Sequence, residues 1–177
     1  MQQALLRKTA IFLASTMYRR CLPSVRGKRG HALTQARFRQ TKMVLISSFF
    51  WIYPATSMNA PVVIWLNGGP GASSTFANFL FNSPLRIAQP TASSYDMYRS
   101  EDTWITQANM IYIDQPVGTG FSYGTPLLTN LEEAKDEFLT FVANLWDAFP
   151  LLAKKDLYMS GESYAGKYIP LYSWALL

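Results

Sequence analysis

The stretch "DLYMSGESYAGKYIP" (residues 156–170) joins an apolar segment to one that can form a helix, and Ser163 lies at the junction. A serine at the apex of a sharp strand-to-helix turn is typical of a serine nucleophile. Such a turn needs small residues two positions before and two after the serine, and Gly161 and Ala165 occupy these positions. The glycine that usually closes the pattern comes one residue late, as Gly166. Alone, the pattern fits a plain turn or a helix N-cap serine equally well.

Four apolar segments, the last of which leads into Ser163, are predicted to be strands. They lack polar alternation, which is the pattern of strands buried on both faces of a parallel or mixed sheet. These segments are residues 44–53, 60–67, 109–114 and 156–161. Between the last two, apolar residues recur at helical spacing, with Thr129 or Asn130 as the cap and Pro150 at the end. Strands that alternate with helical segments predict a layered α/β fold.

A second glycine-rich turn, "WLNGGPGASS" (residues 65–74), also follows a predicted buried strand. Its glycines leave backbone N–H groups free to point into a site. Such a loop can supply one oxyanion donor, while the residue after a nucleophilic serine supplies the other. A phosphate-binding loop is the alternative, but the loop contains no lysine and Pro70 removes one donor.

The basic charge is confined to the start of the chain. Residues 1–42 carry ten Lys or Arg and no Asp or Glu, whereas residues 43–85 carry no charge at all. We interpret residues 1–42 as a basic tail, which is a targeting segment or an unreliable translation start. Because the tail has no recognisable binding motif, we expect no nucleic-acid partner. Prolines and glycines interrupt residues 43–85, so no transmembrane span is expected.

Three motifs occur in a fixed order: "WLNGGPGASS", "NMIYIDQPVGTGFSY" and "GESYAGKYIP". Together they resemble the serine carboxypeptidase family of α/β-hydrolases. The resemblance covers residues 43–177, which we expect to be the N-terminal portion of such a domain, and does not extend to residues 1–42. It implies an α/β-hydrolase-like mixed sheet covered by helices, and removal of single residues from peptide or protein C-termini without a cofactor or metal.

The resemblance also implies how the chemistry is distributed. Ser163 would be the nucleophile of an acyl-enzyme mechanism. The backbone amides of Gly69 and Tyr164 would form the oxyanion hole. This pairing agrees with the two-loop arrangement expected above.

By the same resemblance, Asn67, Gly68 and Glu162 bind the terminal carboxylate of the substrate, and Trp65 supports the site. An ionised glutamate would repel that carboxylate, so Glu162 must be protonated to donate a hydrogen bond. Substrate binding is therefore expected to tighten as the pH falls. The alternative is that Glu162 is only a glutamate favoured by the dipole at a helix N-terminus.

The sequence departs from the family pattern at three points. Ala72 replaces a cysteine, and Phe81 replaces an acid of the carboxylate site and cannot hydrogen-bond a carboxylate. No Asp, Glu or His follows Ser163, and His31, the one histidine, precedes it in the tail. In α/β-hydrolases the acid and then the histidine follow the nucleophile. We therefore expect a fragment that lacks the triad Asp and His and is inactive alone.

Two further functions remain open: a catalytically inactive fragment that binds peptides or other partners, and an acyltransferase on the same scaffold. The family resemblance implies the secretory pathway, the lysosome or vacuole, or the extracellular space. The single cysteine, Cys21, excludes an intrachain disulfide and leaves secretion open.

Overall fold

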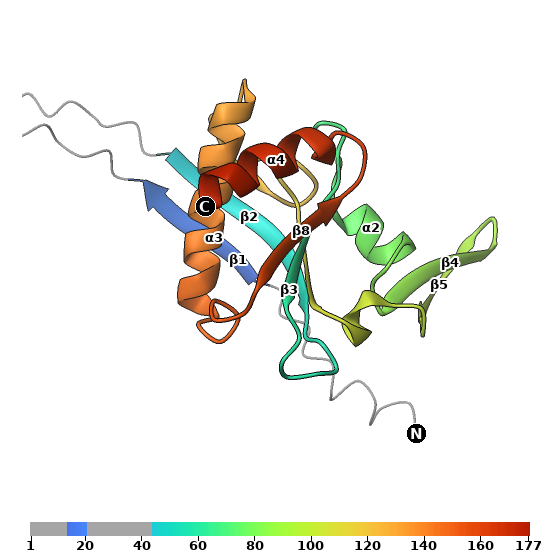
Figure 1. The fold of residues 1–177 in the computed structure, drawn as a ribbon. Helices are drawn as coiled ribbons and strands as arrows, with labels where there is room; N and C mark the ends of the chain where they lie inside the picture. The colour runs from blue at the N-terminus through green and yellow to red at the C-terminus, as the bar shows by residue number, and fades with distance from the viewer. Residues whose placement is uncertain (1–13, 21–43) are drawn as a thin grey trace, which may run out of the picture.

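The computed structural model describes residues 14–20 and 44–177, and these residues form a mixed six-stranded sheet (Figure 1). The strand order is β1-β2-β6-β3-β8, and the short β7 also pairs with β2. β3 runs parallel to β6 and β8, whereas β2 runs antiparallel to β1, β6 and β7. The strands are β1 (Ala14–Arg20), β2 (Val44–Tyr53), β3 (Val62–Leu66), β6 (Asn109–Ile113), β7 (Tyr123–Thr125) and β8 (Leu157–Gly161).

The four strands predicted from the sequence are β2, β3, β6 and β8, and their ends agree to within two residues. Strand β1, which pairs with β2 along Ala14–Arg20, was not predicted from the sequence. The rest of the predicted tail, including Cys21 and His31, lies outside the described residues. The boundary between a tail and a domain at residue 42 therefore stays a prediction.

Alternate residues of the central strands pack into two separate layers. On one face, Ile64 and Ile111 belong to a core cluster with α3 (Leu131–Ala148) and α4 (Ala165–Leu176). On the other face, Trp65 and Tyr112 pack with Ala77 of α2 (Thr75–Leu80) and with Ile105 of the 3-10 helix η2 (Trp104–Thr106). Burial on both faces explains why these strands are apolar without alternation.

The described residues also contain a second, two-stranded sheet. Strands β4 (Leu85–Thr91) and β5 (Ser94–Arg99) form an antiparallel pair beside α2, away from α3 and α4 (Figure 1). Among the described residues, no helix is both long and apolar enough to cross a membrane.

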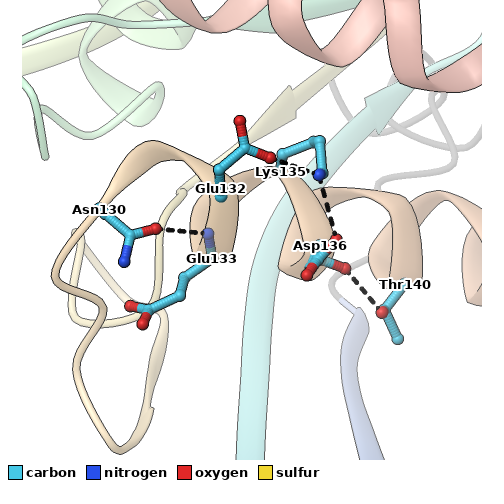
Figure 2. Close-up of polar contacts among 6 residues, drawn as sticks. All are labelled: Asn130, Glu132, Glu133, Lys135, Asp136 and Thr140. Atoms are coloured by element: carbon cyan, nitrogen blue, oxygen red, sulfur yellow. Dashed lines mark hydrogen bonds and ion pairs between the residues drawn. The ribbon is translucent and has the colours of Figure 1, made fainter.

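The predicted helix is α3, and its first turn shows why it begins where it does (Figure 2). The Asn130 side chain accepts a hydrogen bond from the Glu133 amide at 2.9 Å, which satisfies one of the free amides at a helix start. Hydrogen bonding from the Thr129 amide lowers the pKa of Glu133. Lys135 pairs with Glu132 at 2.6 Å and with Asp136 at 3.5 Å on the exposed side. The helix ends at Ala148, just before Pro150.

The parallel strands β3, β6 and β8 end at the same edge of the sheet, so the loops that follow them lie together. These loops are residues 67–74, 114–122 and 162–164, and they contain most of the sequence motifs described above. In open α/β sheets, ligands bind outside the carboxyl ends of the strands. This edge is therefore where a functional site is expected.

Candidate active site

Ser163 lies between the end of β8 at Gly161 and the start of α4 at Ala165. Its φ angle of 57° is the single positive value among the described residues other than glycine. A left-handed conformation at a non-glycine residue is costly and is usually kept for a functional reason. The side chain is exposed. The predicted elbow is therefore present, and it presents the Ser163 hydroxyl to solvent.

The small residues around Ser163 have distinct roles. A Cβ atom on Gly161 would lie 2.2 Å from the Leu66 carbonyl oxygen and 2.7 Å from the Cβ of Ala165. The two arms of the turn and the end of β3 thus leave no room for a side chain at position 161. A Cβ on Gly166 would meet no atom within 4 Å. Ala165 is therefore small enough to close the elbow, and Gly166 is not needed for its packing.

The glycine-rich loop after β3 packs directly against this elbow. A Cβ atom on Gly68 would lie 2.4 Å from the Tyr164 amide nitrogen and 2.9 Å from the Glu162 carbonyl oxygen. Gly69 follows with a φ angle of 104° in an exposed part of the loop. Within the described part of the chain, the amides of Gly69 and Tyr164 donate to no protein acceptor. Both N–H groups are therefore available to a ligand.

Asn67 connects the loop to the elbow through its side chain. Its Oδ1 accepts from Trp65 Nε1 at 2.7 Å, and its Nδ2 donates to Glu162 Oε1 at 3.3 Å. Its backbone amide donates to the Ser74 hydroxyl at 3.1 Å. Asn67 is only 2% exposed, whereas Glu162 is exposed. The structure thus brings Trp65, Asn67 and Glu162 into one hydrogen-bonded row beside Ser163.

Aromatic side chains surround the outer end of this row. The ring centroids of Phe81 and Trp104 lie 6.4 and 5.6 Å, respectively, from the ring centroid of Trp65, and both pairs are edge to face. Phe81 contacts Phe76 in the same way, at 5.5 Å. All three of these neighbours are partly open to solvent. The position where the family resemblance implies an acid therefore presents an apolar ring next to Trp65.

A cavity of about 230 Å³ adjoins the elbow on the side of α3. Tyr164 and Tyr168 of the elbow and α4 form one wall, and Pro70 of the glycine-rich loop contributes to another. Burial raises the pKa of the Tyr168 hydroxyl above its ordinary value. The remaining lining residues are Pro116, Leu128, Thr129, Asn130, Leu131 and Ala134.

The structure also shows residues that the sequence analysis missed. Asp114 and Glu137 are buried carboxyl residues that contact the loop after β6. Glu137 Oε2 accepts from the Val117 amide at 3.1 Å, and burial raises the pKa of Glu137 to about 7. Its position three residues after Ala134 and four before Phe141 was a usable signal, because this spacing places it on the apolar face of α3.

The predicted site residues are thus gathered at the carboxyl ends of β3 and β8, and their catalytic roles stay predictions. His31 lies outside the described residues. In the parts of the chain that the structure describes, no group of three or more His, Cys, Asp or Glu could hold a metal ion.

Comparison with known proteins agrees with this arrangement. A family model described as serine carboxypeptidase matches residues 40–177. Serine carboxypeptidase S10 family member 2 of Dictyostelium discoideum is 41% identical over 130 residues, which cover 69% of this chain and 23% of that protein. The vitellogenic carboxypeptidase of Aedes aegypti is 40% identical over 133 residues, covering 72% and 27%.

The pheromone-processing carboxypeptidase KEX1 of Vanderwaltozyma polyspora is 38% identical over 132 residues, which cover 72% of this chain and 18% of that protein. A solved structure of Kex1Δp, a prohormone-processing carboxypeptidase from Saccharomyces cerevisiae, superposes with a TM-score of 0.68 at 30% identity. It is matched over 82% of this chain and 32% of that chain. The chain therefore spans between 18% and 27% of the length of these curated relatives.

Proposed function

The chain belongs to the serine carboxypeptidase family, and from this premise we propose that Ser163 is the nucleophile of an enzyme that releases single residues from the C-termini of peptides. The observation that carries the proposal is the left-handed, exposed Ser163 held against the glycine-rich loop. Residues 43–177 would form part of the catalytic domain, preceded by the basic tail of residues 1–42, of which β1 pairs with β2. By family membership, the compartment would be the secretory pathway, the lysosome or vacuole, or the extracellular space.

The reaction would proceed through an acyl-enzyme. The Ser163 oxygen attacks the carbonyl carbon of the last peptide bond, while a general base takes its proton. The amides of Gly69 and Tyr164 donate to the oxyanion of the tetrahedral intermediate. The peptide C–N bond then breaks, the proton passes to the leaving amino acid, and water hydrolyses the ester.

The general base and the acid that orients it are proposed to come from outside these 177 residues. No Asp, Glu or His follows Ser163, and a serine hydroxyl is a weak nucleophile without a base. The 177-residue chain alone would therefore release no residues, and at most would bind peptides. A complete chain that supplies both groups would turn over.

Asn67, Gly68 and Glu162 are proposed to bind the terminal carboxylate, with Trp65 as support. The side-chain amide of Asn67 is hydrogen-bonded to Trp65 and to Glu162, the residue before Ser163, which supports this assignment. Phe81 contributes an apolar contact instead of a hydrogen bond. Protonated Glu162 would donate to the substrate, so binding would tighten in acid.

The proposal is tested with the full-length gene product and a set of synthetic peptides. Each peptide is supplied with a free C-terminal carboxylate and, as a matched control, with a C-terminal amide, and the products are followed by mass spectrometry. We expect stepwise loss of single C-terminal residues from the free acids, and no release by Ser163→Ala. Cleavage at internal bonds, or release that survives Ser163→Ala, would reject the proposal. Transfer of the acyl group to an added amine or alcohol in preference to water would favour an acyltransferase.

A further inference from the structure

Asp114 is a buried carboxyl residue at the carboxyl end of β6, and its two oxygens bind two different loops. It is 1% exposed. Its Oδ1 accepts from the Ser73 hydroxyl at 2.5 Å and from the Thr75 amide at 3.3 Å, whereas its Oδ2 accepts from the Phe121 amide at 3.1 Å. Its own amide donates to the Phe49 carbonyl at 3.0 Å, which fixes it to β2. Asp114 therefore links the central strand to both loops.

The first of these loops is the one that packs on the elbow. This loop comprises residues 67–74, and contacts hold it near both of its ends. Near its N-terminal end, Gly68 packs against Tyr164. Near its C-terminal end, the Ser73 hydroxyl donates to Asp114, and the Ser74 hydroxyl accepts from the Asn67 amide. Gly69 lies between these attachments, so the position of its amide depends on where Asp114 holds Ser73.

The second loop, residues 114–122, leaves room for the Asp114 carboxyl group to contact both Phe121 and Ser73. A Cβ atom on Gly120 would lie 2.1 Å from Asp114 Oδ2 and 2.8 Å from the Ser73 hydroxyl oxygen, and Gly120 has a φ angle of 54°. Any larger residue at position 120 would displace the carboxyl group. The Thr75 hydroxyl also donates to the Asp114 carboxyl group, at 3.4 Å. The absence of a side chain at position 120, and the convergence of four donor groups on one carboxyl group, make this a specific arrangement.

We propose that Asp114 is a positioning residue for catalysis: it holds the loop of residues 67–74 so that the Gly69 amide stays beside the Tyr164 amide. The inference rests on the proposed function, because it concerns the oxyanion donors of that reaction. Its role is exerted through Ser73 and Thr75, and Asp114 itself does not contact the reacting atoms.

The test uses Asp114→Asn in the full-length gene product, with Asp147→Asn as the control because Asp147 is exposed on α3. An asparagine keeps the shape of the side chain but turns an NH₂ group toward one of the donors. Active sites are first titrated with a slowly deacylating ester, so that misfolded protein does not count. The turnover number per titrated site, the KM and the affinity for a peptide aldehyde are then measured.

We expect kcat per active site to fall by about a hundredfold, the size seen when an oxyanion donor is lost, while KM changes by less than about threefold. The peptide aldehyde forms a tetrahedral adduct with the serine, so its affinity should fall in parallel with kcat/KM. The matching peptide alcohol, which forms no adduct, should bind as it does to the wild type. A purely structural role would lower the active fraction alone.

Wild-type kcat per titrated site and wild-type aldehyde affinity in Asp114→Asn would overturn the proposal, as would a loss confined to KM. If Asp114→Asn does not fold, Ser73→Ala is used instead, because it removes one donor to the Asp114 carboxyl group. In Ser73→Ala, kcat and the affinity for the aldehyde should fall by about tenfold, with little change in KM. An unchanged Ser73→Ala would then overturn it. If the wild type and Asp147→Asn neither release residues nor bind the aldehyde, the proposed function itself fails, and this inference fails with it.

Discussion

The side-chain amide of Asn67 donates to the carboxyl group of Glu162 at 3.3 Å, across 95 residues of sequence. The same Asn67 side chain accepts from Trp65 at 2.7 Å, so both its amide oxygen and its amide nitrogen make hydrogen bonds. The pair joins the end of β3 to the residue before Ser163. It therefore offers the most direct way to perturb the proposed carboxylate site without touching the nucleophile.

Replacing Glu162 should remove the pH dependence of substrate binding. In Glu162→Gln the side-chain amide donates a hydrogen bond at every pH, so the KM for a free-acid peptide should stay the same when the pH is lowered. In the wild type, KM should fall as the pH is lowered, because only a protonated carboxyl group can donate this hydrogen bond. At neutral pH the variant should bind about tenfold more tightly, the size of a hydrogen bond to a charged group. Steady-state kinetics checks this, and parallel KM profiles for both proteins would contradict it.

Removing the amide of Asn67 should weaken both the fold and the site. Asn67→Ala leaves the buried Trp65 Nε1 without its acceptor, so we expect about 1–3 kcal/mol less stability and a higher KM. Asn59→Ala is the matched control, because Asn59 is exposed and its side chain makes no hydrogen bond within the described residues. Urea unfolding and KM are measured for both. Equal behaviour of the two variants would show that the Trp65–Asn67–Glu162 row has no energetic weight.

Two glycines near Ser163 should respond in opposite ways to alanine. Gly161→Ala would place a Cβ 2.2 Å from the Leu66 carbonyl oxygen, so the elbow must shift and activity should be lost. Gly166→Ala meets no atom within 4 Å and lies in α4, so it should stabilise the protein by about 0.5–1 kcal/mol and leave activity intact. Thermal unfolding and peptide release check both. Tolerance of Gly161→Ala would contradict the packing described for the elbow.

The buried carboxyl of Glu137 should make stability fall as the pH rises. Burial raises its pKa from 4.5 to about 7, so the fold favours the protonated form. Its contribution is fully present below pH 4.5 and is lost as the pH rises through about 7, by up to about 3 kcal/mol. Glu137→Gln keeps an acceptor for Val117 and should remove this dependence. Denaturant unfolding at several pH values measures it, and an equal pH dependence of stability in both proteins would contradict the effect of burial on the Glu137 carboxyl group.

Much of the fold could be predicted from local sequence. Unbroken apolar segments indicated β2, β3, β6 and β8, and helical spacing indicated α3. Burial explains the pattern in β3, β6 and α3. The expected burial of β8 on both faces was wrong, because β8 lies at the edge of the sheet and is only partly buried. The small residues around Ser163 indicated the elbow, because the two arms of such a turn approach each other closely. Position 165 carries alanine where the usual pattern has glycine. This difference is compatible with the elbow, since the close approach of the two arms needs only a small side chain there.

What could not be predicted depends on pairing between distant segments. The strand order and the antiparallel β1 require knowledge of which edges meet, which local patterns do not contain. The Asn67–Glu162 contact and the role of Asp114 arise only when the ends of β3, β6 and β8 are placed side by side. Asp114 did carry one signal, since an acid that ends a buried apolar strand is rarely buried without partners.

The most direct test of the central claim is covalent labelling of Ser163 by a fluorophosphonate in the full-length gene product. We expect a single adduct that peptide mapping places on Ser163, formed at a rate that falls when a free-acid peptide is added. Ser163→Ala should neither label nor release C-terminal residues. An adduct on another residue, or undiminished peptide release by Ser163→Ala, would show that this serine is not the nucleophile.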